Sequence, residues 1–177
     1  DSCICMTDRE ECIMKLTASM EKALNEQVVK EFHSAYLYLS MAKDMKREGF
    51  PGYAAWLTKQ YNEEREHALK LSDYIEDRDG TTEFGAIDAI TTHFECPVVV
   101  AEAALKHEEY ISDSIRTLFK KARAEGDLET EVFLQWYITE QVEEEANAHD
   151  VLSGFTASHE DTAALHNFDH FLGKRKD

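Results

Sequence analysis

Apolar residues recur along most of the chain at alternating steps of three and four, which is the spacing of amphipathic α-helices. The pattern predicts four long helices, over residues 18–47, 51–77, 97–124 and 128–153. Gly and Pro at 49–52, and Gly154 after the fourth helix, supply the expected stop and start signals. A shorter amphipathic segment covers residues 159–172. The sequence therefore predicts an all-α protein.

Residues 78–95 separate the second and third predicted helices and lack helical periodicity. This link is long for a compact domain, in which neighbouring helices are joined by about 2–8 residues. It is long enough to run the length of a bundle, so that the helices on either side of it are parallel. We therefore expect one four-helix domain over residues 18–177 and an N-terminal extension over 1–17. A capping box at 7–10 could start a helix as early as Asp8.

Composition narrows the classes of function. The 177 residues carry a formal net charge of −17, from 36 acidic and 19 basic side chains, which disfavours nucleic acid and anionic membranes as partners and attracts cations. A solvated acidic surface alone would give the same charge. No run approaches the roughly 20 apolar residues of a membrane-spanning helix. We expect a soluble intracellular protein, of the cytoplasm or, if a transit peptide has been removed, of an organelle such as a plastid.

The four cysteines do not predict a disulfide framework in a chain with this much apolar sequence. Cys3 and Cys5 form a C-x-C pair, but no second pair lies nearby, so a structural zinc site is not expected. We interpret Cys3, Cys5 and Cys12 as reduced thiols of the extension.

Acidic residues interrupt the apolar stripe of every long predicted helix near its middle. They are Glu31, Glu64, Glu108, and Glu140 with Glu144. A single buried acid could be a paired structural residue, but uncompensated burial costs several kcal/mol, and four such acids in one core would be very unfavourable. A multivalent cation would neutralise them. Carboxylates with one imidazole suit iron and leave coordination positions open for O₂.

Glu64 and His67 form a Glu-x-x-His pair on one face of the second helix. Such a pair is common on solvated helix faces, and here it becomes informative through its register with the acids of the other helices. Tyr38 lies two turns beyond Glu31 on the same stripe. It could be a core tyrosine with a satisfied hydroxyl, or a hydrogen-bond donor to a metal ligand and a one-electron donor.

Longer motifs on all four helices resemble those of ferritins, over roughly residues 18–172. They are Leu24-Asn25-Glu26-Gln27, Tyr36-Leu37-Tyr38-Leu39-Ser40-Met41, Glu63-Glu64-Arg65-Glu66-His67-Ala68, Lys106-His107-Glu108, Phe133-Leu134-Gln135-Trp136-Tyr137 and Glu140-Gln141. The resemblance implies a ferritin-like four-helix bundle with a long crossover between its second and third helices, B and C. It also implies a short fifth C-terminal helix over residues 159–172.

The resemblance further implies a di-iron ferroxidase centre within each subunit. The implied ligands of the first iron are Glu31, Glu64 and His67. Those of the second iron are Glu64 as a bridge, Glu108 and Glu144. The catalytic set also includes Tyr38 and Gln141.

A third iron site, as in prokaryotic non-haem ferritins, is implied by Glu144 and the acid that follows it. Its ligands would be Glu63, Glu140 and Glu143, with Glu144 shared. The segment 63–68 resembles eukaryotic ferritins more closely, and Glu140 and Glu143 could instead face solvent or the interior of a cage.

The function implied is iron storage and detoxification, in which Fe²⁺ is oxidised with O₂ and Fe³⁺ is stored as mineral inside a 24-subunit homo-oligomer. Asp127, Glu129 and Glu131 could line a pore through this cage, or could form an acidic first turn that the helix dipole favours. His166 and His170 are interpreted as packing or pore-lining residues.

Haem is not expected. Bacterioferritins carry a second Glu-x-x-His in the last helix, whereas Asn147 follows Glu144 at that spacing, and Arg65 stands where their haem-ligating methionine would be. Two functions of other classes stay open: a di-iron oxidoreductase that acts on an organic substrate, and a non-catalytic cage that buffers divalent metal.

Overall fold

The structure, a computed structural model, describes residues 15–174. The expected helix start at Asp8 and the three cysteines of the N-terminal extension lie outside the described residues. Within the described part, every regular element is a helix. The helices are α1 (Ala18–Arg47), α2 (Pro51–Asp77), α3 (Pro97–Glu125), α4 (Leu128–Ser158) and α5 (Thr162–Leu172). The predicted all-α class is confirmed.

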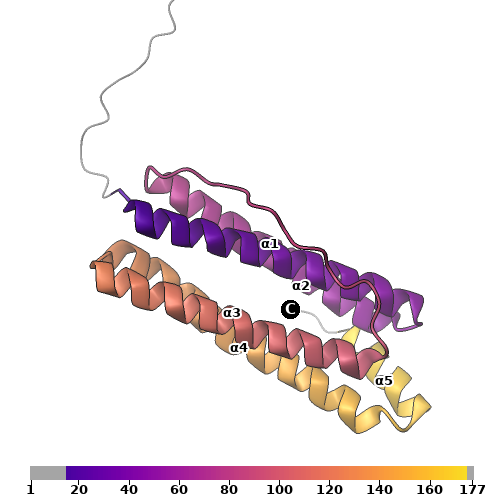
Figure 1. The fold of residues 1–177 in the computed structure, drawn as a ribbon. Helices are drawn as coiled ribbons and strands as arrows, with labels where there is room; N and C mark the ends of the chain where they lie inside the picture. Colours follow the sequence, from indigo (N-terminus) through magenta and orange to yellow (C-terminus); the bar gives the residue numbers. More distant parts are fainter. Residues whose placement is uncertain (1–14, 175–177) are drawn as a thin grey trace, which may run out of the picture.

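Figure 1 shows two helical hairpins, α1–α2 and α3–α4, packed side by side, with α5 at one end of the bundle. The link over residues 78–96 runs back along the α1–α2 hairpin, so α2 and α3 point the same way. Side chains of α1 hold this link in place. The amide of Asn25 donates to Thr81 O at 2.9 Å and accepts from Glu83 N at 2.7 Å, and Ser40 Oγ donates to Thr91 O at 2.6 Å. The predicted bundle with a long crossover and a short fifth helix is confirmed.

The fourth helix is longer than the sequence predicts, because Gly154 does not end it. α4 continues to Ser158, and the ring of Phe168 from α5 packs directly on Gly154. A Cβ atom at position 154 would lie 2.1 Å from the nearest atom of that ring. The glycine is therefore a packing site for the fifth helix, and the prediction that it is a helix stop is wrong.

The fifth helix also caps the second. Asp169 is buried, and its carboxylate accepts hydrogen bonds from Gly52 N at 3.1 Å and Tyr53 N at 2.7 Å. These N–H groups belong to the first turn of α2, where an α-helix offers them no partner of its own. α5 thus satisfies the start of α2 and fixes that end of the bundle.

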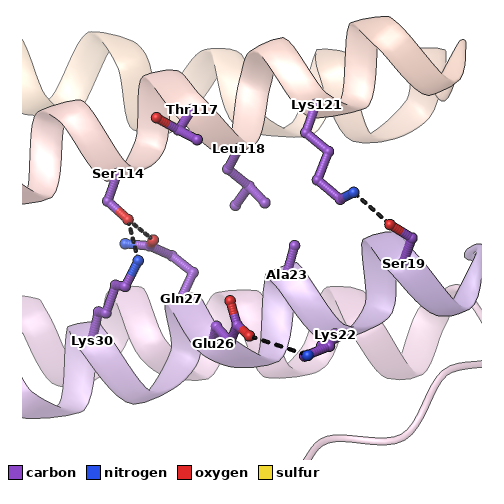
Figure 2. Close-up of a pocket in the computed structure, with 10 residues that line it drawn as sticks. All are labelled: Ser19, Lys22, Ala23, Glu26, Gln27, Lys30, Ser114, Thr117, Leu118 and Lys121. Atoms are coloured by element: carbon purple, nitrogen blue, oxygen red, sulfur yellow. Dashed lines mark hydrogen bonds and ion pairs between the residues drawn. The ribbon is translucent and has the colours of Figure 1, made fainter.

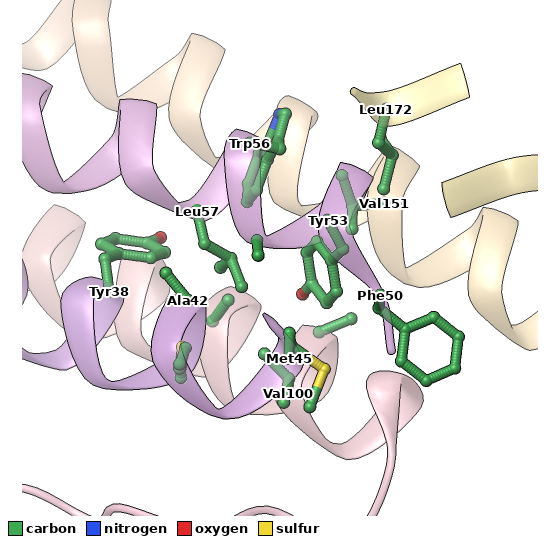
Figure 3. Packing of buried hydrophobic residues seen from close by; sticks show 14 of the residues in the cluster. Tyr38, Ala42, Met45, Phe50, Tyr53, Trp56, Leu57, Val100, Val151 and Leu172 are labelled. Carbon is green, nitrogen blue, oxygen red and sulfur yellow. The ribbon is translucent and has the colours of Figure 1, made fainter. Parts of the chain in front are cut away.

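The apolar core consists of two clusters, one toward each end of the bundle. The cluster next to α5 contains Tyr38, Tyr53 and Leu57 (Figure 3), and the other contains Leu24 and Ile115. Every long helix contributes buried residues to both clusters, and between them it has a stretch that contributes no fully buried residue to either. These stretches are 29–37 in α1, 58–70 in α2, 105–110 in α3 and 138–150 in α4. All the predicted ligands fall within these four stretches.

Candidate metal centre

Four carboxylates are buried between the two apolar clusters, one from each long helix. Glu31, Glu64, Glu108 and Glu144 are each at most 5% exposed. Each is placed by the helical register of its own element, because the apolar residues one or two turns away on the same face pack into the clusters on either side. The sequence prediction that acids of four helices share one depth of the core therefore matches their positions.

Three of these side chains offer a set of ligand atoms for a cation. Ligand atoms of Glu31, Glu64 and His67 lie within 4.8 Å of one another. Across the part of the chain that the structure describes, no hydrogen-bond partner is found for Glu31 Oε2, for either Glu64 oxygen or for His67 Nδ1. Buried polar atoms in proteins are almost always paired, so unpaired ones that gather in one place need an explanation. The donor set fits a divalent iron ion.

Glu108 is held by two neighbours. The Tyr38 hydroxyl donates to its Oε1, and Gln141 Nε2 donates to its Oε2 at 3.1 Å. Gln141 also lies 3.3 Å from Ser112 Oγ. Glu108 projects from α3, and its carboxylate is oriented by Tyr38 of α1 and Gln141 of α4.

Glu144 belongs to a second group of ligand atoms, with His67 and Glu140, whose members also lie within 4.8 Å of one another. Gln60 of α2 donates to Glu144 Oε2 at 2.8 Å. Glu144 therefore faces both His67 and the amide of Gln60, so that α2 and α4 are joined through the centre.

Electrostatics favour a bound cation at this position. Burial and the Glu108 charge together raise the pKa of Glu144 to about 9. The same two effects, partly offset by hydrogen bonds, raise the pKa of Glu31 to about 7. Burial, followed by repulsion from three neighbouring carboxylates, raises the pKa of Glu64 well above its usual value. Burial also lowers the pKa of His67 to about 4. Without metal, the centre therefore keeps protons on its acids near neutral pH, and a cation that binds there displaces them.

Comparison with known proteins identifies the family. The sequence profile of the ferritin family, described as a ferritin-like domain, matches residues 21–157. The chain belongs to the ferritin family. It is 37% identical over 160 residues to a bacterial non-heme ferritin of Bacteroides fragilis, covering 90% of this chain and 99% of that protein. A bacterial non-heme ferritin of Staphylococcus aureus is 32% identical over 160 residues, with 90% of this chain and 96% of that protein covered.

Solved ferritin structures have the same fold. An open-pore ferritin from the archaeon Archaeoglobus fulgidus matches with a TM-score of 0.90 and 36% identity, covering 92% of this chain and 100% of that one. A humanized archaeal ferritin matches with a TM-score of 0.89 and 37% identity, covering 92% and 98%. Within residues 15–174 of the present ferritin chain, no helix is both long and apolar enough to cross a membrane.

The four acids predicted for a third site are not gathered into one group. Glu140 is half-buried and joins His67 and Glu144, whereas Glu143 is exposed and Glu63 is half-buried. Neither Glu63 nor Glu143 belongs to a group of three ligand atoms among the described residues. Glu63 nevertheless raises the pKa of Glu144, and Glu143 raises that of Glu140, so both lie close enough for their charges to act on the site.

Sequence reasoning missed several residues that touch the centre. Gln27 stands one helical turn before Glu31 and donates to it at 2.8 Å. Gln60 stands one turn before Glu64 but donates across the bundle to Glu144, also at 2.8 Å. The Tyr137 hydroxyl donates to His67 O at 2.7 Å, and the Trp136 ring meets the His67 ring edge-on at a centroid distance of 5.3 Å. The sequence could have indicated the two glutamines, because each lies one helical turn before an acid on the same apolar stripe, where an amide donor can stand beside a carboxylate acceptor.

A third group of ligand atoms, from Asp44, Glu48 and His93, has a structural explanation. Asp44 Oδ2 accepts from Phe94 N at 2.7 Å, and its Oδ1 accepts from His93 at 3.2 Å and from Arg47. Burial would raise the pKa of Asp44, but these hydrogen bonds and the neighbouring positive charge outweigh it and lower that pKa. The carboxylate joins the end of α1 to the last residues of the crossover, and both of its oxygens already accept hydrogen bonds.

The residues considered for a pore divide into two kinds. Asp127 is buried as the N-cap of α4, accepting from Thr130 N at 3.0 Å and from Arg78 at 3.0 Å. Glu131 pairs with Arg123 at 2.7 Å, and Glu129 is exposed. The first turn is therefore acidic for reasons internal to the subunit, and Glu129 alone of the three is left to face outward. His166 stacks on Phe50 at a centroid distance of 5.5 Å, as a packing residue would.

Proposed function

We propose that this protein stores iron and oxidises Fe²⁺ with O₂ at the centre between α1, α2, α3 and α4. The observation that carries the proposal is a set of buried atoms on Glu31, Glu64 and His67 for which residues 15–174 supply no hydrogen bond, next to two further buried carboxylates. A structural core would not leave these groups unpaired, because each such atom costs free energy. Two cations of charge +2 would match the four carboxylates in charge.

The residues divide naturally between two iron ions. Glu31 and His67 hold the first, and Glu108 and Glu144 hold the second. Glu64 bridges them, since its ligand atom lies within 4.8 Å of those of Glu31 and His67, and it is also close enough to Glu108 and Glu144 to be repelled by their charges. Tyr38, Gln141 and Gln60 orient the ligands of the second ion and do not bind it.

The reaction balances with two ions and one O₂. Each Fe²⁺ loses one electron, and O₂ takes up both electrons and two protons to give H₂O₂. Because both electrons are available in one site, superoxide need not leave it. Carboxylates favour the product, since their attraction to Fe³⁺ exceeds that to Fe²⁺ at the same distance. The Fe³⁺ then leaves for a mineral, which returns the site to its metal-free form.

The mineral requires an enclosed space, and we include assembly into a 24-subunit shell in the proposal. Support comes from the family, and from the exposed aromatic side chains Tyr36, Phe84 and Tyr110 on the α1, crossover and α3 surfaces, which would be covered by neighbouring subunits. A shell of 24 chains of 20.3 kDa would have a mass of about 490 kDa. Light scattering after size exclusion measures this mass, and a dimer mass would refute the shell without touching the oxidation site.

The oxidation step is tested by mixing metal-free protein with Fe²⁺ in air and recording the diferric absorbance. We expect rapid growth in the unmodified protein and its loss in Glu64→Ala. Glu66→Ala is the matched control, because Glu66 lies on the same helix but is exposed. Equal, slow oxidation in all three proteins would refute the ferroxidase and leave a cage that only buffers metal. Rapid growth of the absorbance in the unmodified protein and in Glu66→Ala, but not in Glu64→Ala, supports the ferroxidase.

A further inference from the structure

A surface pocket of about 360 Å³ lies between α1 and α3. One of its lining residues, Gln27, donates a hydrogen bond to Glu31 of the metal centre. Figure 2 shows Gln27 and Lys30 of α1 reaching across this pocket to Ser114 of α3. Gln27 is only 2% exposed, whereas Lys30 is half-buried at the pocket surface. The pocket thus contains a connection between solvent and the interior of the bundle.

The connection is a chain of three hydrogen bonds that ends on a predicted iron ligand. Lys30 Nζ lies 2.7 Å from Ser114 Oγ, Ser114 Oγ lies 2.6 Å from Gln27 Oε1, and Gln27 Nε2 lies 2.8 Å from Glu31 Oε1. The other oxygen of Glu31, Oε2, has no hydrogen-bond partner among residues 15–174. One oxygen is therefore held by the chain, and the other is left for a metal.

The direction of this chain is set at its surface end. A lysine ammonium carries only donors, so Ser114 Oγ must accept from Lys30. The hydroxyl hydrogen of Ser114 is then free to point at Gln27 Oε1. With its oxygen engaged in this way, Gln27 turns its NH₂ group toward Glu31, whose Oε1 accepts; once Glu31 is ionised, as a metal ligand must be, it can only accept. Reversal of the Gln27 amide would place its oxygen against that carboxylate and break two bonds of the chain.

We propose that Lys30 is a positioning residue of the metal centre, which acts through Ser114 and Gln27 to hold the Glu31 carboxylate with one oxygen free for the first metal ion. The proposal rests on the proposed function, in that Glu31 is taken as a ligand. Hydrogen bonds to a ligand carboxylate fix its orientation, and their loss typically lowers metal affinity about 10–100-fold. Since Lys30 is two bonds further out, we expect a smaller effect, of about 3–10-fold.

Charge alone predicts the opposite sign. Lys30 is a cation near a site for cations, so the removal of its charge would tighten metal binding if repulsion were its only effect. Loss of Lys30 also removes a charge that lowers the pKa of Glu31, whereas Ser114→Ala leaves that charge in place, so weaker binding in both variants indicates lost positioning. The sign of the change in the two variants separates the two accounts without reference to oxidation activity.

The test measures Zn²⁺ binding to the assembled, metal-free protein by titration calorimetry, because Zn²⁺ does not change oxidation state. We expect Lys30→Met and Ser114→Ala each to weaken the tightest site about 3–10-fold, and the double variant to be no weaker than Ser114→Ala, since the chain is already broken. Lys30→Arg retains a donor and should recover most of the affinity. Lys22→Met is the control, because Lys22 lines the same pocket but pairs with Glu26 at 4.0 Å and lies outside the chain.

The outcomes separate this inference from the proposed function. Glu31→Ala, measured alongside, should lose the tightest Zn²⁺ site, and unchanged binding in that variant would overturn the centre itself. If Glu31→Ala loses the site while Lys30→Met binds Zn²⁺ as tightly as the unmodified protein, or more tightly, the positioning role alone is overturned. An equal loss in Lys22→Met would also overturn it, because that would assign the effect to the pocket as a whole.

Discussion

The Tyr38 hydroxyl of α1 donates its hydrogen bond to Oε1 of Glu108 on α3, so a core tyrosine holds a buried carboxylate across the bundle. The sequence left open whether Tyr38 is a satisfied core residue or a donor to a metal ligand. One contact makes it both, since Glu108 is a predicted ligand. Burial and the neighbouring carboxylates raise the pKa of Tyr38 well above its ordinary value, so the hydroxyl keeps its proton and remains a donor.

Loss of this donor should destabilise the metal-free protein. We expect Tyr38→Phe to lower the free energy of unfolding by about 1–3 kcal/mol, because Glu108 Oε1 is left buried without its partner. Tyr53→Phe is the matched control. Tyr53 is equally buried, but within the described residues its hydroxyl has no partner, so its removal should cost nothing or stabilise slightly. Denaturant unfolding at matched protein concentration measures both, and equal losses would contradict the assignment.

The stability of the metal-free protein should fall as pH rises above about 6.5. An unfolded glutamic acid loses its proton near pH 4.5, whereas Glu31 keeps it to about pH 7 and Glu144 to about pH 9. Between these values the folded state binds more protons than the unfolded state, so the free energy of unfolding decreases with pH. His67 acts oppositely, but only between its lowered pKa of about 4 and its ordinary 6.5. Above pH 6.5 the carboxyl groups act alone.

Unfolding free energies measured from pH 6.5 to 9 check this, with an expected fall on the order of a few kcal/mol. Glu144→Gln cannot ionise and should flatten the upper part of the curve. Added Zn²⁺ should reverse the trend, because metal binds the ionised acids and stabilises the folded state more as pH rises. Stability that increases with pH in the metal-free protein would rule out the buried, protonated centre.

The Gln60 amide should matter for metal binding although Gln60 is not a ligand. It donates to Glu144 Oε2 at 2.8 Å, so Gln60→Leu leaves that oxygen without its donor and the carboxylate less well oriented. We expect Fe²⁺ affinity, measured without O₂, to fall about 10–100-fold. Asn62→Ala is the comparison, since Asn62 lies on the same helix but donates to Thr58 O instead. The role fails if the two variants bind Fe²⁺ equally well.

Gly154→Ala should loosen the fifth helix. The added Cβ would meet the Phe168 ring at 2.1 Å, so α5 must shift, at a cost of about 1–3 kcal/mol in unfolding free energy. Faster amide hydrogen exchange over 162–172 would locate the effect. Phe168→Leu in the same background should recover part of the loss by relieving the contact. An unchanged stability in Gly154→Ala would mean that α5 does not pack as closely as described.

Local patterns were enough to predict the bundle, its crossover and the four buried acids, because helical register is a property of neighbouring residues. Gly154 shows where local patterns fail: a glycine after an apolar stripe indicates a helix stop, unless a ring from another helix occupies the space above it. Asp169 is a second case, since nothing near it in sequence indicates that it caps α2. Both depend on contacts between distant segments.

For the candidate site, too, part of the arrangement follows from the sequence and part depends on how the helices pack. The register that placed Glu31, Glu64, Glu108 and Glu144 at one depth was read from the chain, and their burial agrees with it. The grouping of Glu140, and not of Glu143, with His67 depends on how α4 is rotated against α2. Successive residues on a helix point about 100° apart, so a small rotation decides which acid turns inward.

By itself, the sequence determined that ionisable side chains interrupt four apolar stripes, because periodicity of 3.6 residues assigns each residue to a face before any tertiary contact forms. Only the tertiary structure decided which oxygens of those side chains are held and which stay free. Tyr38 reaches Glu108, Gln60 reaches Glu144, and Gln27 reaches Glu31 with Ser114 of another helix behind it. A hydrogen bond depends on the position of two atoms within a few tenths of an ångström, and such positions are fixed only when the helices have packed.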